Sequence, residues 1–234
     1  MKPVVIVSAD GEWSAVKKLF PKEHLQHSPF GEIINLRLDT LELTLLHGGW
    51  GKISAAATAQ YVMDQFKPDL LVNLGTCGGF EGRIERETII LVEKTIIYDI
   101  FEKMTDGLEE IAFYTTILDL SWLPRVLPFP VLRGLLVSGD RDILAEDIPM
   151  LVQKYQAVAA DWESGAIAWV AKRNGVRTLI LRGVTDLVGA DGGEAYGDYE
   201  LFVQRTNGIM KKLFDQLPKW LSAIEKVEQG YRGY

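Results

Sequence analysis

The sequence is poor in the residues that build disulfides and metal sites. It contains one cysteine, Cys77, and three histidines among 234 residues. A single cysteine excludes an internal disulfide, and the histidines lack the spacing of metal ligands, so no metal site is expected. Cys77 could be a nucleophile, but no Cys/His/Asn arrangement accompanies it. A small buried thiol is therefore the better interpretation.

Basic clusters and a targeting segment are missing as well. Asp and Glu number 32 against 25 Lys and Arg, which gives a formal net charge of -7. Nucleic acids and anionic membranes bind clustered cations, so neither is an expected partner. The apolar residues 1–9 are followed directly by Asp10 and Glu12, without a small-residue cleavage site. They are interpreted as a first strand, and a cytoplasmic protein is expected.

What the chain does have is an alternation of short apolar runs and helical stretches. Unbroken apolar runs are typical of strands buried on both faces of a parallel sheet. With 234 residues, one α/β domain over 1–234 is expected, with a frayed tail at about 225–234. The expected strands are 4–7, a hairpin of 33–39 and 41–46, 69–74, 89–92, 131–137 and 178–181. The expected helices are 13–20, 53–66, 162–170 and 199–221. Residues 98–114, 118–130 and 190–198 are expected to form no regular structure. Of these segments, 98–114 is expected to be a loop over an opening, and 190–198 is expected to be a mobile loop.

Small or acidic residues follow four of the expected strands. These strand ends carry Glu12, Gly75-Thr76, Ser138-Gly139-Asp140 and Asp186, and Glu163 stands at the mouth of the helix before the last of these strands. Ligands of open α/β sheets bind outside the carboxyl ends of the strands, which favours one shared pocket. Glu12 also fits a plainer interpretation, an acid favoured by the dipole of the helix it begins. Asp140, Arg141 and Asp142 could simply pair with one another at the surface.

A glycine-rich turn, residues 47–52, precedes the helix 53–66. Its backbone amides could cradle an anion, or its glycines could merely let the chain pass close to the helix. The spacing matches neither the GxGxxG nor the Walker pattern, so no nucleotide cofactor is expected.

If the four strand ends converge, the pocket holds three separated carboxylates, Glu12, Glu163 and Asp186, without a set of metal ligands. Cleavage of a glycosidic bond needs an acid for the leaving group, a base for water and an anchor for sugar hydroxyls. The residues alone therefore favour this class of chemistry.

Five motifs occur in one order along most of the chain: GWGKISAA, VNLGTCGG, VSGD, DWESGAIA and RGVTD. In this order the chain resembles, over about residues 3–220, the nucleoside phosphorylase superfamily, and within it most closely the methylthioadenosine/S-adenosylhomocysteine nucleosidases. The resemblance implies a single-domain three-layer sandwich with a central mixed, mostly parallel sheet flanked by helices. It also implies a homodimer with the pocket near the interface, and no cofactor.

The resemblance implies catalytic roles for matching residues. Asp186 is similar to the acid that protonates purine N7, so that the base leaves neutral, and Thr185 would steady it. Glu12 is similar to the glutamate that helps activate water. Thr76, in the Gly75-Thr76 turn, would lie beside the ribose and the nucleophile.

The resemblance also implies substrate contacts. Glu163 resembles the carboxylate that binds the ribose hydroxyls, and Trp162 stands where relatives place a Met under the sugar. The backbone of Asp142 and Ile143 would face the base. Asp142 stands near the position of an aromatic residue that stacks on adenine in bacterial nucleosidases, so the base or the 5′ substituent could differ from theirs.

The choice between water and phosphate as nucleophile depends on one position. Phosphorylases of the superfamily carry an arginine two residues before the Gly-Ser/Thr turn, and this chain has Asn73 there. Arginine grips phosphate with a bidentate fork, so its absence favours hydrolysis. A purine nucleoside phosphorylase, a nucleosidase for another substrate such as futalosine, and a non-catalytic nucleoside-binding protein stay open as alternatives. Three costly carboxylates in one pocket argue against the last.

Overall fold

The computed structural model describes residues 1–38 and 41–231. One large mixed sheet forms the centre, and most of its paired residues lie in parallel ladders. In chain order the elements are β1 Pro3–Val7, α1 Asp10–Leu19, β2 Leu25–His27, β3 Glu32–Leu38, β4 Leu41–His47, α2 Gly51–Phe66, β5 Leu70–Phe80, β6 Ile89–Ile97, α3 Leu108–Phe113, β7 Thr115–Ile117, β8 Leu132–Ser138, α4 Ile148–Tyr155, β9 Ala157–Asp161, α5 Ser164–Arg173, β10 Arg177–Gly189, β11 Gly192–Gly193 and α6 Tyr199–Tyr231.

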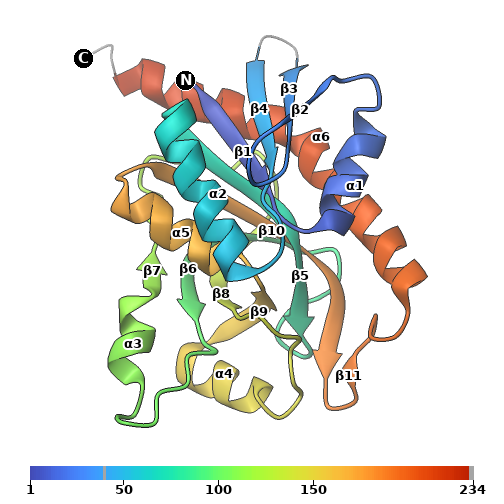
Figure 1. Ribbon diagram of the computed structural model, residues 1–234, viewed down its shortest axis with the longest axis vertical. Coiled ribbons are helices and arrows are strands. Elements are labelled where there is room, and N and C mark those ends of the chain that lie inside the picture. Colours follow the sequence, from blue (N-terminus) through green and yellow to red (C-terminus); the bar gives the residue numbers. More distant parts are fainter. Residues whose placement is uncertain (39–40, 232–234) are drawn as a thin grey trace.

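Helices cover both faces of this sheet and make three layers (Figure 1). The alternation of side chains along β1 shows how the strands serve both faces. Val5 and Val7 pack with α1 and α6, whereas Val4 and Ile6 pack with α2 and α5. Because both faces are covered, the strands are apolar throughout, as the unbroken apolar runs indicate. The expected α/β sandwich with a mixed, mostly parallel sheet is confirmed.

Strand order places the expected strand ends next to one another. The four strands β4, β1, β5 and β10 are neighbours and run parallel, so their carboxyl ends lie at the same edge of the sheet. On the other side of the terminal part of β5 lies β9, which pairs with it antiparallel and with β8 parallel. β5 is thus the central strand of the candidate site.

Two strands extend further than the sequence predicts. β5 does not break at Gly75 but continues to Phe80, and β10 continues past Asp186 to Gly189. The two strands pair along this whole length, with a register irregularity between Val184 and Asp186. The glycines of β5 persist in a strand because neighbouring side chains occupy the space above them.

The remaining differences concern helix boundaries and loops. Helix α1 begins at Asp10 rather than at residue 13, and α5 begins at Ser164, so Trp162 lies just before it. The expected loop 98–114 contains α3, and helix α6 continues to Tyr231, so the expected frayed tail is helical up to that residue. The predicted turn at 39–40 and residues 232–234 lie outside the described residues.

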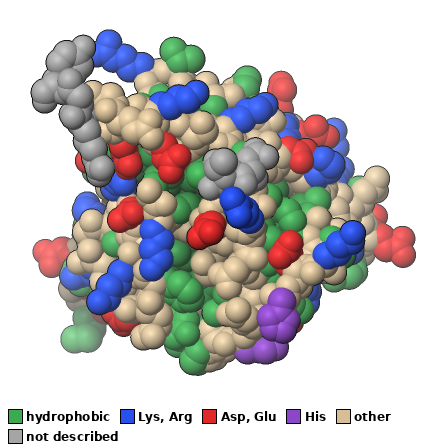
Figure 2. Space-filling view, turned by 90° about the horizontal axis from the view of Figure 1, so that it is seen from above, with side chains coloured by type: hydrophobic (Ala, Val, Ile, Leu, Met, Phe, Trp, Pro, Cys, Tyr) green, Lys and Arg blue, Asp and Glu red, His purple; other side chains and the backbone are tan. Residues whose placement is uncertain are grey.

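Charges of both signs are interspersed on the face seen in Figure 2, and no block of Lys and Arg covers it. Over residues 1–38 and 41–231, no helix is both long enough and apolar enough to span a bilayer.

Candidate active site

Glu12 is held from two directions at the carboxyl edge of the sheet. It lies in the first turn of α1 and is only 2% exposed. Its Oε1 accepts hydrogen bonds from the backbone N–H of Thr76 (2.5 Å) and from the Thr76 hydroxyl (2.9 Å). The backbone N–H of Ala9 donates to Oε2 (3.3 Å). Burial with these partners goes beyond what the helix dipole alone explains, and it brings together Glu12 and Thr76, two residues that the resemblance singles out separately.

Arg182, which the sequence analysis did not single out, is fully buried beneath Glu12. Each nitrogen of its guanidinium reaches a protein acceptor. Nε donates to Ser164 Oγ (2.8 Å), Nη2 donates to Asn73 Oδ1 (2.9 Å), and Nη1 lies 3.4 Å from Glu12 Oε1. A buried charge is stable only when it is paired in this way.

Asp161, at the end of β9, is a fourth buried carboxylate that the sequence analysis also missed. Its Oδ2 lies 3.0 Å from Arg182 Nε. Its Oδ1 accepts a hydrogen bond from Ser138 Oγ (2.6 Å), and the backbone N–H of Ser164 donates to both carboxylate oxygens. Arg182 therefore links Glu12 and Asp161, which stand 149 residues apart in the chain, into one network.

Gly75 makes room for this network. A β-carbon built on Gly75 would lie 1.8 Å from Arg182 Nη1 and 2.7 Å from Glu12 Oε1. The small residue at this point of β5 therefore admits a protein side chain, that of Arg182.

Glu163 forms the boundary between β9 and α5 and is 5% exposed. Its Oε1 accepts a hydrogen bond from the backbone N–H of Gly51 (3.1 Å). Burial, with the nearby negative charge of Asp161, raises the pKa of Glu163 to about 8.

The glycine-rich turn 47–52 does cradle anions, but they are carboxylates of the protein itself. Besides the Gly51 N–H on Glu163, the Lys52 N–H donates to Asp140 Oδ1 (2.7 Å). The Lys52 ammonium pairs with Asp99 and lies 3.6 Å from Asp140. The suggested surface pairing among residues 140–142 is wrong for Asp140, and also for Arg141, which pairs with Asp147.

Asp186 lies inside β10, beside the irregularity in its pairing with β5, and is 6% exposed. The Thr185 hydroxyl donates to its Oδ1 (2.7 Å), so the predicted contact of these two residues is present. Burial nevertheless raises the pKa of Asp186 above its ordinary value, which favours the protonated form.

Sheet register brings the two halves of the site together at Gly78. This residue of β5 pairs with Asp186 on one side and with Ala160, next to Asp161, on the other. The side chain of Ile143 covers it, since a β-carbon built on Gly78 would lie 2.8 Å from Ile143 Cδ1. Asp186, Ile143 and the Asp161–Glu163 turn therefore surround one end of β5.

The other predicted contact residues lie at the margin of this region. Trp162 is half-buried and Asp142 is exposed. The Ile143 carbonyl accepts a hydrogen bond from the Tyr196 hydroxyl (3.1 Å), which connects it to the segment after β11. Cys77 is buried and free, as expected, and burial raises the pKa of its thiol well above its ordinary value.

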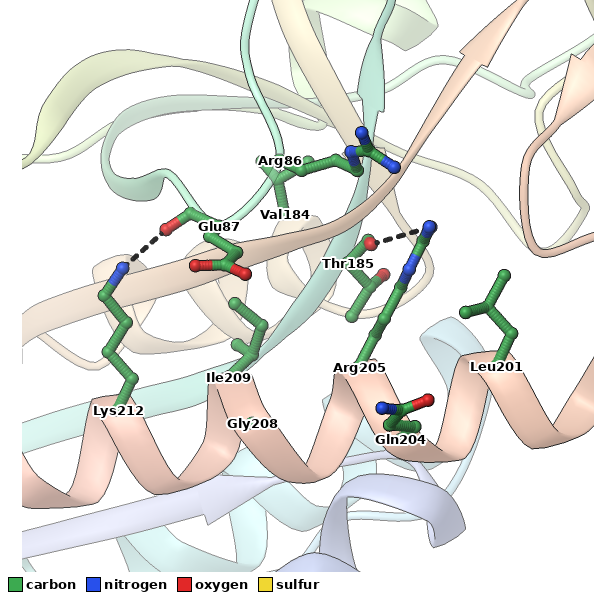
Figure 3. A pocket seen from close by; sticks show the side chains of 10 residues that line it. All are labelled: Arg86, Glu87, Val184, Thr185, Leu201, Gln204, Arg205, Gly208, Ile209 and Lys212. Carbon is green, nitrogen blue, oxygen red and sulfur yellow. Dashed lines mark hydrogen bonds between the residues drawn. The ribbon is translucent and has the colours of Figure 1, made fainter.

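A surface cavity of about 490 Å³ lies between β10 and α6, and Glu12, Asp161, Glu163 and Asp186 are not among the residues that line it (Figure 3). Its lining includes Arg86, Thr185, Arg205 and Lys212. The chemistry-bearing side chains face the carboxyl edge of the sheet instead, so this cavity is not taken as the substrate site.

The family model described as "Phosphorylase superfamily" matches residues 3–217. The chain belongs to the phosphorylase superfamily.

Named relatives within the superfamily share about a quarter of their residues with this chain. The 5′-methylthioadenosine/S-adenosylhomocysteine nucleosidase of Maridesulfovibrio salexigens is 26% identical over 186 residues, which cover 74% of this chain and 80% of the relative. The enzyme of the same name from Geobacillus kaustophilus is 25% identical over 183 residues, covering 70% of this chain and 74% of the relative.

Solved structures of the superfamily share the fold. The 5′-methylthioadenosine nucleosidase of Arabidopsis thaliana matches with a TM-score of 0.76 at 22% identity, covering 96% of each chain. The Helicobacter pylori 5′-methylthioadenosine/S-adenosylhomocysteine nucleosidase, solved with butyl-thio-DADMe-Immucillin-A, matches with a TM-score of 0.75 at 17% identity. That match covers 92% of this chain and 99% of the H. pylori chain.

Proposed function

We propose that this superfamily member is a nucleosidase that hydrolyses the N-glycosidic bond of a purine nucleoside, of the methylthioadenosine/S-adenosylhomocysteine type. The observation that carries the proposal is the division of labour among buried carboxylates at one sheet edge. Burial raises the pKa of Asp186, while Glu12 is paired with a buried guanidinium. One group suited to give a proton and one suited to take a proton are what hydrolysis of a glycosidic bond requires.

In this mechanism Asp186 gives its proton to the purine at N7, and the bond between the sugar C1′ and the base nitrogen breaks. The electron pair of that bond leaves with the base, which is neutral because it has gained the proton. Positive charge develops on the sugar, and Glu163 holds the sugar in place through hydrogen bonds with the ribose hydroxyls. The half-buried Trp162 would lie under the sugar.

Water then forms the new bond to C1′ and loses a proton to Glu12. Thr76 and Arg182 hold the carboxylate of Glu12 in place during this step. The products are free base and free sugar, with the proton lost by Asp186 matched by the one gained by Glu12. No metal or cofactor enters the scheme.

Water is favoured over phosphate because the cations near the site are already engaged. Asn73, at the position of the phosphorylase arginine, binds Arg182 with its side-chain oxygen (2.9 Å) and the carbonyl of Ile6 with its side-chain nitrogen (3.0 Å). Arg182 has an acceptor at every nitrogen, and Lys52 pairs with Asp99. Phosphate would have to displace protein carboxylates to reach either cation.

The experiment is incubation with a panel of purine nucleosides, including methylthioadenosine, S-adenosylhomocysteine, inosine and futalosine, with and without phosphate. We expect free base at a rate that phosphate does not raise. Phosphate-dependent release with ribose-1-phosphate would identify a phosphorylase, and binding of a nucleoside without base release would identify a non-catalytic binder.

We also propose that the chain forms a homodimer near this site. Exposed apolar side chains occur at the start of α2, on Trp50 and Ile53, and on the segment after β6, on Phe101 and Met104. The ion pair of Lys52 and Asp99 joins these two segments. Large apolar side chains exposed on two connected segments fit a protein interface. Light scattering would give twice the chain mass of 26.2 kDa, and a monomer would contradict the proposal.

A further inference from the structure

The Asp186 carboxylate is supported by its neighbour in β10. The Thr185 hydroxyl donates to Asp186 Oδ1 (2.7 Å). The position of Thr185 therefore affects how well Asp186 can release a proton, because this donor stabilises the carboxylate that remains.

The segment Glu194-Ala195-Tyr196, which follows β11, is attached to other elements at both ends. On one side, the backbone N–H of Glu194 donates to the Leu187 carbonyl (3.0 Å), and the Glu194 carboxylate accepts from the Leu187 N–H (3.1 Å). On the other side, the Tyr196 hydroxyl donates to the Ile143 carbonyl (3.1 Å). The segment is thus attached directly beside Asp186, because Leu187 is the next residue of β10.

Arg205 connects this segment to the strand that carries Asp186. From α6, its Nη1 donates to the Thr185 carbonyl (3.3 Å) and to Glu194 Oε2 (3.1 Å). Figure 3 shows the side chain reaching from the helix along the cavity wall to Thr185. Arg205 is 22% exposed, whereas Arg86, which pairs with the same Glu194 at 3.4 Å, is 52% exposed. Arg205 is thus the less exposed of the two arginines, and it contacts both Glu194 and the strand that carries Asp186.

We propose that Arg205 is a positioning residue for Asp186: it ties Glu194 to the Thr185 backbone and so holds the Thr185 hydroxyl against the acid. The inference rests on the proposed function for its effect on turnover, but not for its effect on the segment. The hydrogen bonds of Arg205 go to Thr185 and Glu194, not to the carboxylate of Asp186. Arg205 acts through Thr185, and its positive charge adds to the stabilisation of the carboxylate left after proton transfer.

The test compares Arg205→Ala, Arg205→Lys and Lys212→Ala in base release and in chymotrypsin cleavage after Tyr196, with cleavage sites read by mass spectrometry. Lys212 is the matched control, because it lines the same cavity from the same helix but donates to the Glu87 carbonyl (2.8 Å). For Arg205→Ala we expect kcat to fall on the order of tenfold, the scale of one charge-assisted hydrogen bond, with KM little changed. Cleavage after Tyr196 should accelerate.

Arg205→Lys should recover part of kcat and of the resistance to cleavage, since it keeps the charge with fewer donors. Lys212→Ala should match the wild type in both assays. Unchanged cleavage in Arg205→Ala, or an equal loss of kcat in Lys212→Ala, would overturn the proposal. If the wild type releases no base, the proposed function fails, the effect on turnover is withdrawn, and cleavage alone decides whether Arg205 fastens the segment.

Discussion

The two halves of the site are built in different ways. Glu12 and Asp161 are fixed from within by Arg182, which has no exposed surface, and by hydrogen bonds from Thr76, Ser138 and Ser164. Asp186 is instead supported by Thr185, whose backbone is held from α6 by Arg205, a partly exposed side chain that also pairs with Glu194. The inner half is a rigid charge network, whereas the outer half can be altered without opening the core.

This difference fits the division of chemical tasks. A carboxylate that orients water benefits from a fixed partner, and a buried ion pair provides one. A carboxyl that must hold a proton and then release it needs burial without a strong cation in direct contact. Substitutions in the inner half should therefore affect folding as well as turnover, and those in the outer half should affect turnover alone.

The largest effect is expected from Arg182→Met, which leaves Glu12 and Asp161 buried without their shared cation. Loss of one partner of a buried pair typically costs about 3–5 kcal/mol in the free energy of unfolding. Urea denaturation at pH 7 measures it. Arg133→Met is the control, because Arg133 pairs with Glu93 at an exposed site, and such pairs contribute roughly 0–1 kcal/mol. Equal, small losses in both variants would show that the inner network is not structural.

Asp186→Asn tests the outer half. The amide cannot donate an acidic proton, so we expect kcat to fall about 10²- to 10⁴-fold, the usual contribution of a general acid. The thermal midpoint should stay near that of the wild type. Asp191→Asn, an exposed change in the turn after β10, should be neutral in both measurements. Turnover like that of the wild type in Asp186→Asn would remove Asp186 from the mechanism.

Glu163→Gln should change stability by an amount that depends on pH. The pKa of Glu163 is about 8 in the folded protein and near the ordinary 4.5 when unfolded. Between these values the folded state holds a proton that the unfolded state has lost, so wild-type stability falls as pH rises, by at most about 1.4 kcal/mol per pH unit.

Glutamine cannot ionise, so the stability of the variant does not depend on pH through this position. The thermal midpoint of Glu163→Gln, relative to the wild type, should therefore rise from pH 5 to pH 8 and then level off. The exposed Glu42→Gln change serves as control. A difference that does not vary with pH would mean that Glu163 is ionised in the free protein.

The sequence predicts much of the fold because its apolar runs and motifs are local. The strand cores and the two faces of the sheet follow from side-chain periodicity. Where β5 and β10 end could not be predicted, since glycine usually interrupts a strand. Here Gly75, Gly78 and Gly79 stay in the strand because Arg182, Ile143 and Ile84 pack over them.

Part of the candidate site could be predicted because some of its residues also belong to local patterns. Glu12, Glu163 and Asp186 stand at recognisable strand ends and helix starts. Arg182 and Asp161 were missed because their partners are distant in sequence. One signal was present: an arginine directly after an apolar strand expected to be buried on both faces must be paired if it is buried too, which implies a buried acid nearby. The Arg205 contact lies on a long amphipathic helix, where nothing in the pattern distinguishes it from a solvated cation.

The central claim, hydrolysis by water at this site, is tested most directly by base release in ¹⁸O-labelled water with phosphate present. We expect free purine and a free sugar that carries one ¹⁸O atom at C1′. An unlabelled sugar phosphate, or no base release from any purine nucleoside, would contradict the account.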